Sequence, residues 1–278
     1  MSRHTSLKIG GPADLFAVPE DTADLQKLVR QLCEQQIPWM AIGRGYNLLV
    51  RDKGIRGAVI SLERLNQVDD VGDNRIRAGA GAENLAVVRF AQERGLGGIG
   101  FIAGIPGTIG GAIRMNAGAY GQGILEQTAC LTLLRDGRVH EFCIQEMNYS
   151  YRHLELEPGD IVLEALFALH PCAAENTEEE IRRDLELRRS KHNVGFPSAG
   201  SFFKNPPGQA AWRLIDAAGM RGVRAGGAQV SEVHSNFLVN AGGATARDFL
   251  ELAHRVKNAV LSHCGITLEE EVRVLGEE

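Results

Sequence analysis

The chain has 278 residues and a formal net charge of −5, with 44% apolar and 23% charged residues. These proportions are typical of folded globular proteins and exclude global disorder, and the length suits more than one domain. The mild acidic balance gives no electrostatic reason to expect nucleic acid or an anionic membrane as a partner. Glycine contributes 33 residues, well above an average share of roughly 7%, which indicates many tight backbone positions.

In the first half of the chain, apolar spacing predicts alternating short strands and helices. The expected elements are a helix over 21–36, strands over 39–42, 58–62 and 75–80, and a helix over 83–94. Residues 95–123 hold eleven glycines and cannot form one regular element throughout.

Further along, strands over 131–135 and 138–144 flank Asp136-Gly137, which predicts a hairpin with a two-residue turn. A strand over 161–170 follows, and a polar stretch places a domain boundary near residues 170–180.

The last part of the chain mixes helices and strands again. The expected elements are helices over 178–189, 209–218 and 244–264 and strands over 236–239 and 272–275. This order indicates an α+β protein, since a doubly wound fold would show long alternation of strands and helices.

The cysteines and histidines show no pattern of a disulfide framework or a metal site. The five cysteines are widely spaced and form no CxxC pair, so we expect small buried side chains in a reducing compartment. The histidines lack metal-ligand spacing, and we predict no metal. Neither a signal peptide nor a run of about 20 apolar residues is present, so we expect a cytoplasmic protein without membrane contact.

Two glycine clusters are candidate cofactor-binding loops. The first, IGRGYNLLV at 42–50, runs from a strand into G-x-G and an asparagine, a weak signal that a tight β-turn would equally explain. The second, AGIPGTIGGA at 103–112 with MNAGAYG at 115–121, lets a backbone approach a pyrophosphate closely. It matches neither the P-loop nor the Rossmann fingerprint, and a purely structural loop is the alternative.

The run GIPGTIGGAIRMNAGAYG resembles the signature of the UDP-N-acetylenolpyruvoylglucosamine reductase family. The resemblance continues through HTSLKIGGPADLF, AIGRGYNLLV, PSAGSFFKNPPG, LIDAAGMRGVRAGGAQVSEVHSNFLVN and LEEEVRVLG, in that order. It implies a two-lobed FAD-binding module of the vanillyl-alcohol-oxidase type followed by an α+β substrate domain, in the shorter of the family's two forms. The implied lobes are residues 1–70 and 71–175, and the implied substrate domain is 176–278.

The resemblance also implies the reaction and its partners. NADPH would reduce a tightly but non-covalently bound FAD, and a hydride would then pass to the methylene carbon of an enolpyruvyl ether of UDP-N-acetylglucosamine, giving UDP-N-acetylmuramate for peptidoglycan synthesis. NADPH would use the same cavity as this substrate and leave before it binds. We favour a monomer.

Three residues resemble the family's catalytic set, and the reaction needs what they offer. Hydride addition leaves negative charge beside a carboxylate, which requires a stabilising group and then a proton donor. By motif position, Arg152 resembles the active-site arginine, Ser201 the proton donor and Glu271 the active-site glutamate. Taken alone, these would be a surface ion pair, a turn residue and part of a solvated acidic run.

The resemblance extends to the binding residues. The implied FAD contacts are Gly43, Arg44, Gly45, Tyr46, Asn47, Leu48, Pro106, Gly107, Thr108, Gly110, Gly111, Asn116 and Gly118. The candidates for the UDP-sugar are Arg188, Arg189, Lys204 and Asn205, with His234 and Asn236 as weaker ones, although the arginine pair would equally cap a helix.

The sequence departs from the family pattern at a few positions. Tyr46 stands where the family usually has serine, and there we expect the backbone N–H to be the ligand. Leu154 stands where the family commonly has serine, and His192-Asn193 where it often has Gln-Pro.

Two alternative functions stay open. One is an FAD-linked oxidase on the same module, and the other is a non-catalytic protein that binds flavin or a UDP-sugar.

Overall fold

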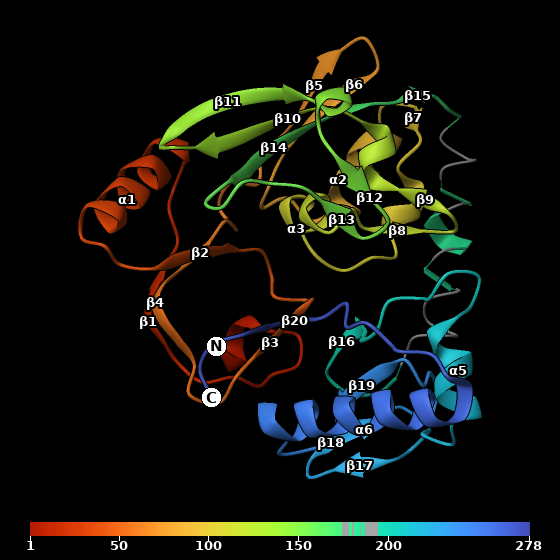
Figure 1. The fold of residues 1–278 in the computed structure, drawn as a ribbon. Coiled ribbons are helices and arrows are strands. Elements are labelled where there is room, and N and C mark those ends of the chain that lie inside the picture. Colours follow the sequence, from red (N-terminus) through yellow and green to blue (C-terminus); the bar gives the residue numbers. More distant parts are fainter. Residues whose placement is uncertain (174–177, 180, 184, 187–193) are drawn as a thin grey trace. The chain divides into compact units, whose positions relative to one another are not determined.

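The computed structural model describes residues 1–173, 178–179, 181–183, 185–186 and 194–278 (Figure 1). The chain divides into two compact units made of separate segments. The C-terminal unit comprises Met1–Asp14, Gly45–Arg56 and Leu187–Glu278, and the central unit comprises Leu15–Arg44 and Gly57–Glu186. Both units mix helices with sheets, as the predicted α+β class requires. The division into 1–70, 71–175 and 176–278 stays a prediction.

A five-stranded antiparallel sheet forms the main layer of the central unit, in the order β11-β10-β14-β6-β5. Its strands are β5 (Val68–Gly72), β6 (Arg75–Gly79), β10 (Thr128–Arg135), β11 (Arg138–Cys143) and β14 (Ile161–Ala168). Asp136 and Gly137, between β10 and β11, have φ values of 51° and 72°. Two positive φ angles define a type I′ turn, so the predicted two-residue hairpin is confirmed.

The helices of the central unit cover apolar faces of its sheets. The helix α1 (Thr22–Glu34) begins at Asp21, whose carboxylate accepts the N–H of Asp24 at 2.8 Å, and it buries Leu25, Val29 and Leu32. It packs against a three-stranded sheet of order β1-β4-β2 that contains β1 (Ala13–Ala17), β2 (Trp39–Ile42) and β4 (Ile55–Ser61). The helix α3 (Ile109–Arg114) lies against β14 and β6, and α2 (Asn84–Gln92) packs on β7 (Leu96–Gly97).

Short elements complete the central unit. They are β8 (Gly118–Ala119), β9 (Gln122–Gly123), β12 (Tyr149–Ser150), β13 (His153–Leu154), β15 (His170–Pro171) and the 3-10 turns η2 (Gly100–Ile102), η3 (Ile124–Gln127) and η4 (Ile144–Glu146). Part of the charged helix expected over 178–189 lies outside the described residues, and the described positions within 178–186 are helical.

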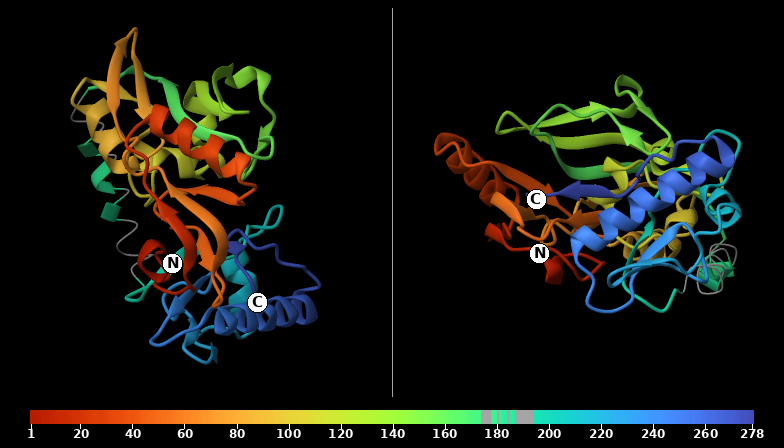
Figure 2. Two further views of the ribbon diagram at one scale, coloured as in Figure 1. Left: turned by 90° about the vertical axis from the view of Figure 1, so that its left-hand side faces the viewer. Right: turned by 60° about the horizontal axis from the view of Figure 1, so that its bottom comes forward.

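The C-terminal unit contains a four-stranded antiparallel sheet, in the order β16-β19-β18-β17. Its strands are β16 (Ser198–Ser201), β17 (Arg224–Ala225), β18 (Ala228–Val230) and β19 (Phe237–Asn240). The long helix α6 (Ala246–Cys264) lies along β17 and β18, and α5 (Ala211–Ala217) packs on α6 (Figure 2). The parallel pair β3 (Leu48–Val50) and β20 (Arg273–Leu275) and the turn η1 (Ser2–His4) complete the unit.

Three acceptors fix the start of α6. Thr245 and Asp248 form a capping box, and the carboxylate of Asp52 accepts the N–H groups of Ala246 and Arg247 at 2.8 and 3.1 Å. These carboxylates satisfy orphan donors of the first turn and suit the positive end of the helix dipole. Asp52 thereby ties the segment 45–56, which carries part of the first glycine cluster, to this unit.

Candidate active site

The second glycine cluster is held against the start of α2 in the central unit. Asn84 donates its backbone N–H to the Gly107 carbonyl at 3.1 Å and its side-chain amide to the Ile105 carbonyl at 3.0 Å. The N–H of Ile109 donates to the Ala82 carbonyl at 2.9 Å. Asn84 is 2% exposed, and sequence analysis did not single it out, because its partners lie more than twenty positions away along the chain.

Thr108, at the N-terminal boundary of α3, carries a buried hydroxyl that calls for a ligand. Its side chain is 2% exposed, and Oγ1 has no hydrogen-bond partner among the described residues. A Cβ at Gly43 would lie 2.5 Å from this oxygen, and one at Gly111 would lie 3.8 Å away. Because buried hydroxyls are rarely left unsatisfied, these two glycines and Thr108 fit an anionic cofactor group approaching the backbone closely.

The other predicted cofactor residues of the central unit lie around this loop. Arg44, which follows Gly43, forms an ion pair with Glu83, and Glu83 forms a β-bridge with Thr108. Gly110 donates its N–H to the Ala80 carbonyl at 2.9 Å, and a Cβ there would meet the Ala80 side chain at 2.7 Å. Gly110 therefore serves close packing of α3 on the sheet. Pro106 is exposed at the entrance of the loop.

The candidate catalytic arginine contacts two predicted cofactor residues. Arg152 lies between β12 and β13 with a φ of 57°, and its guanidinium donates to the carbonyls of Asn116 at 3.4 Å and Gly118 at 2.9 Å. The Asn116 amide donates to the Ser150 carbonyl at 2.9 Å and accepts the N–H of Leu125 at 3.3 Å. Asn116 thus acts through the backbone it holds, and it brings the Arg152 hairpin to the glycine-rich segment.

In the C-terminal unit, backbone hydrogen bonds join the two segments that carry Ser201 and Glu271. Ser201 ends β16, and the carbonyl of the next residue, Phe202, accepts the N–H of Glu271 at 2.8 Å. The Asn47 amide donates to the Glu271 carbonyl at 3.0 Å, and the Asn47 carbonyl accepts the N–H of Arg273 at 3.0 Å. The structure therefore brings together the proton-donor candidate, the glutamate candidate and one predicted FAD residue.

Asn236 positions the chain directly after Ser201. It is 3% exposed, and its amide donates to the Phe203 carbonyl at 2.8 Å and accepts the Phe203 N–H at 3.0 Å. Its own carbonyl accepts the N–H of Phe202 at 2.7 Å. Asn236 is a weaker substrate candidate by its motif position, but its amide group bonds the backbone of Phe203, so we assign it a positioning role.

The remaining FAD candidates of the C-terminal unit form the turn before β3. Gly45 has a φ of 65°, and its carbonyl accepts the N–H of Ser6 at 3.2 Å. The side chain of Tyr46 is 38% exposed, and its carbonyl accepts the Ser6 hydroxyl at 3.4 Å. Leu48 pairs with Arg273 in the parallel β3–β20 ladder. The expectation that the backbone N–H of Tyr46 is the FAD ligand stays a prediction.

The substrate candidates that follow Ser201 have partners of their own. Lys204 forms an ion pair with Glu269, and Asn205 accepts the N–H of Ala211 at 3.0 Å through its amide oxygen. Asn205 therefore accepts an N–H at the start of α5 and is also a candidate for the UDP-sugar. Arg188 and Arg189 lie outside the described residues, as do His192 and Asn193.

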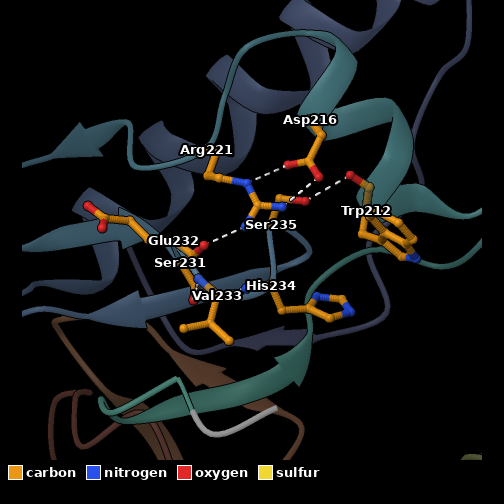
Figure 3. Close-up of polar contacts among 8 residues, drawn as sticks. All are labelled: Trp212, Asp216, Arg221, Ser231, Glu232, Val233, His234 and Ser235. Atoms are coloured by element: carbon orange, nitrogen blue, oxygen red, sulfur yellow. Dashed lines mark hydrogen bonds and ion pairs between the residues drawn. The ribbon is translucent and has the colours of Figure 1, made fainter. Parts of the chain in front are cut away.

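The ring of His234 lies near that of Trp212 in the C-terminal unit (Figure 3). Its ring centroid lies 4.7 Å from that of Phe237 and 6.4 Å from that of Trp212. Beside it, Arg221 holds both carboxylate oxygens of Asp216, at 3.0 and 2.6 Å, as Figure 3 shows. Burial lowers the pKa of His234, and the positive charge of Arg221 acts in the same direction.

This pKa shift predicts that acid destabilises the fold through His234. The neutral imidazole is favoured in the folded chain, so the unfolded chain binds more protons below its ordinary pKa of about 6.5. The free energy of unfolding should therefore fall as the pH drops below about 6.5. In His234→Phe, which keeps the ring packing, the free energy of unfolding should fall less steeply over the same pH range. Urea unfolding at several pH values measures both slopes, and equal slopes for the two proteins would contradict this prediction.

No group of three His, Cys, Asp or Glu side chains could hold a metal ion within the described part of the chain. In the same part, no helix is both long and apolar enough to cross a membrane.

Comparison with known proteins gives both halves of the chain a family. A model described as an FAD binding domain matches residues 13–142, and one described as the C-terminal domain of UDP-N-acetylenolpyruvoylglucosamine reductase matches 191–275. A curated protein of that name from Pelobacter propionicus is 76% identical over 278 residues, covering 100% of this chain and 94% of the relative. One from Geobacter sulfurreducens is 50% identical, covering 100% and 93%.

A solved structure agrees with these matches. The crystal structure of the reductase of the same description from Thermus caldophilus has 34% identity and a TM-score of 0.86, and the alignment covers 99% of this chain and 97% of that one. The fold and the matched domains thus define an FAD-dependent oxidoreductase. This chain belongs to the UDP-N-acetylenolpyruvoylglucosamine reductase family. Membership confirms the predicted resemblance, fold class, enzyme class, reaction, FAD cofactor and NADPH co-substrate, while the site residues stay predictions.

Proposed function

We propose that Arg152, Ser201 and Glu271 carry the family's reaction in this chain, the reduction of the enolpyruvyl ether of UDP-N-acetylglucosamine to UDP-N-acetylmuramate. The observation that carries the proposal is the hydrogen-bonded junction in the C-terminal unit, where the chain at Ser201 and Phe202 meets Glu271 and Asn47. These bonds join the two segments through the backbone of Phe202 and Glu271.

The FAD would be held by residues of both glycine clusters. In the central unit these are Thr108, which offers its buried hydroxyl, Gly43, where a side chain would crowd that hydroxyl, and Gly111, whose Cβ position lies 3.8 Å from it. In the C-terminal unit, the backbone of Gly45 and Tyr46 and the side chain of Asn47 are the candidates. When bound, FAD supplies the two-electron chemistry that links NADPH oxidation to reduction of the enolpyruvyl double bond.

The protein residues supply charge stabilisation and a proton. The guanidinium of Arg152 is oriented by two backbone carbonyls. Its positive charge would stabilise the negative charge that develops beside the substrate carboxylate. Ser201 then gives a proton to the carbon next to that carboxylate. A serine hydroxyl is a weak acid, but it suffices here because the accepting carbon is strongly basic and the hydroxyl is held in position.

The UDP-sugar candidates supply the remaining charge. Lys204 follows the Ser201 strand, and its ammonium forms an ion pair with the exposed Glu269, so a diphosphate can replace that surface partner at little cost.

We also propose that the protein acts as a monomer in the cytoplasm. The net charge of −5 supports a location away from anionic surfaces.

Thr108→Val should separate cofactor binding from folding. Valine keeps the shape of the side chain but removes a buried hydroxyl that has no partner among the described residues, so the stability of the flavin-free protein should stay equal or rise. The affinity for FAD should fall by about tenfold, the usual cost of one hydrogen bond to a charged group. Flavin titration measures the affinity for FAD, and urea unfolding of the flavin-free protein measures the stability. Both are compared between Thr108→Val and the parent protein. Unchanged FAD affinity would remove Thr108 from the cofactor site.

Steady-state turnover tests the proposed reaction. Purified protein with its bound flavin should oxidise NADPH only when the enolpyruvyl ether of UDP-N-acetylglucosamine is present, and should form one UDP-N-acetylmuramate for each NADPH consumed. NADPH oxidation that is independent of this sugar, with oxygen as the acceptor, would favour the FAD-linked oxidase. Flavin that NADPH does not reduce would favour the binding protein.

A further inference from the structure

Cys130 and Cys143 face each other across the β10–β11 hairpin of the central unit. The ladder between these strands runs without a bulge from Arg135↔Arg138, which close the type I′ turn, to Cys130↔Cys143. In a hairpin with a two-residue loop the closing pair is hydrogen-bonded, and hydrogen-bonded and non-hydrogen-bonded pairs alternate from there. Counting back five pairs places the two cysteines at a non-hydrogen-bonded pair.

This register suits a covalent bond between the two sulfurs. The Cα atoms of a non-hydrogen-bonded pair lie about 4.5 Å apart, which is within the range that a disulfide spans. Both residues are free thiols in the structure, and their Sγ atoms are 3.7 Å apart. Rotation about the two Cα–Cβ bonds can therefore close the distance without moving the backbone.

The pair is also accessible to a small oxidant. β11 is an outermost strand of the five-stranded sheet, and Cys143 at its end is exposed, whereas Cys130 is half-buried. The expectation that the cysteines are buried is therefore wrong for this pair. Burial raises the pKa of the Cys130 thiol, and its neighbour Cys143 raises it further. Cys143 is therefore the sulfur that a reagent reaches first. Cys130 lies next to it and can attack the mixed disulfide that forms on Cys143.

We propose that Cys130 and Cys143 form a reversible dithiol–disulfide site that exchanges with small disulfides of the glutathione type. The Cys143 thiolate attacks one sulfur of oxidised glutathione, and one glutathione thiolate leaves. Cys130 then loses its proton and attacks the Cys143 sulfur of the mixed disulfide, and the second glutathione thiolate leaves. The two protein thiols lose two electrons and two protons, which the two departing glutathione molecules take up.

The location gives this bond a structural consequence. After Cys143 the chain continues through η4 into the β12–β13 hairpin, which carries Arg152. The disulfide would fix the end of an outer strand at the point where this segment begins. In a reducing compartment such an exposed pair is expected to be oxidised only transiently, as in a redox-responsive site.

Incubation of the purified holoenzyme with glutathione redox buffers, followed by acid quenching, alkylation and peptide mass spectrometry, tests the proposal. The wild-type chain should yield a peptide pair joined by Cys130 and Cys143, and dithiothreitol should reverse the bond. Cys130→Ser should instead accumulate glutathione on Cys143, because the resolving thiol is missing. Exposed Cys33 serves as the internal control and should carry glutathione without forming an intramolecular bond.

Three outcomes would overturn the proposal. In the first, Cys143 of the wild-type chain accumulates glutathione as it does in Cys130→Ser. In the second, a non-reducing gel shows disulfides that link separate chains. In the third, both thiols remain reduced at every ratio of oxidised to reduced glutathione. None of these readouts depends on the reductase activity.

Discussion

Ser201→Ala should abolish one half of the catalytic cycle and spare the other. Reduction of the bound flavin by NADPH requires no proton at the sugar and should proceed at the wild-type rate. Reoxidation of the flavin by the enolpyruvyl UDP-sugar should slow by roughly 10²–10⁴-fold, the usual contribution of a positioned proton donor. Anaerobic stopped-flow absorbance measures the two half-reactions separately.

Ser198→Ala is the matched control for this variant. Ser198 lies in the same strand, β16, three positions before Ser201, and pairs with Val239. Loss of its hydroxyl should leave both half-reactions unchanged. Reoxidation at the parent rate in Ser201→Ala would show that this serine is not the proton donor.

Arg152→Lys should slow reoxidation by about 10²–10³-fold, the cost of removing one preorganised donor from developing negative charge. Lysine keeps the positive charge but cannot donate to the Asn116 and Gly118 carbonyls as a planar fork while also facing the substrate. Because Arg152 also contacts predicted FAD residues, flavin content should be measured alongside the half-reactions.

Arg114→Lys controls for the structural part of that effect. Arg114 donates to the carbonyl of Leu154 at 2.9 Å, in the same hairpin, and so shares the anchoring role of Arg152 without its proposed chemistry. We expect a small loss of thermal stability and near-normal half-reactions from Arg114→Lys. Equal losses of reoxidation in the two variants would reduce Arg152 to an anchor for the hairpin.

Elements with a strong local signal were predictable from the sequence. The helix expected over 244–264 is observed as Ala246–Cys264, and the turn at Asp136-Gly137 forms the predicted hairpin. In both cases the information lies within a few neighbouring residues, as apolar periodicity or turn chemistry. The strand β16 lacks such a signal, because it pairs with β19, far along the chain. The strands β17 and β18 form a local hairpin, but at two and three residues they are too short to show an alternating pattern.

The high glycine content of residues 95–123 left one helix without a signal in the sequence. The stretch over 95–123 contains the helix α3, which forms although two of its six residues are glycines. Packing stabilises it, since Gly110 lets the helix backbone approach Ala80 more closely than any side chain would allow. Intrinsic propensity disfavours a helix there, and tertiary contacts override it.

Motif positions predicted the candidate site residues, while the residues that hold them in place came only from the structure. Asn84 and Asp52 each bond backbone groups many positions away in the sequence. Asn236, a weaker substrate candidate by sequence, likewise bonds the distant backbone of Phe203, and this positioning role is seen only in the structure. An isolated polar residue in a sequence does not indicate which carbonyl or N–H it will meet, so these anchors carry no local signal. Arg152 was predicted, but its left-handed backbone conformation was not.

The most direct test of the proposed function is an anaerobic absorbance measurement on the purified holoenzyme. One equivalent of NADPH per flavin is added, and loss of the oxidised flavin absorbance shows that the flavin is reduced. The enolpyruvyl ether of UDP-N-acetylglucosamine is then added. We predict rapid and complete return of the oxidised flavin spectrum with formation of one equivalent of UDP-N-acetylmuramate. A flavin that NADPH reduces but this sugar fails to reoxidise would contradict the proposed reaction and point to a different electron acceptor.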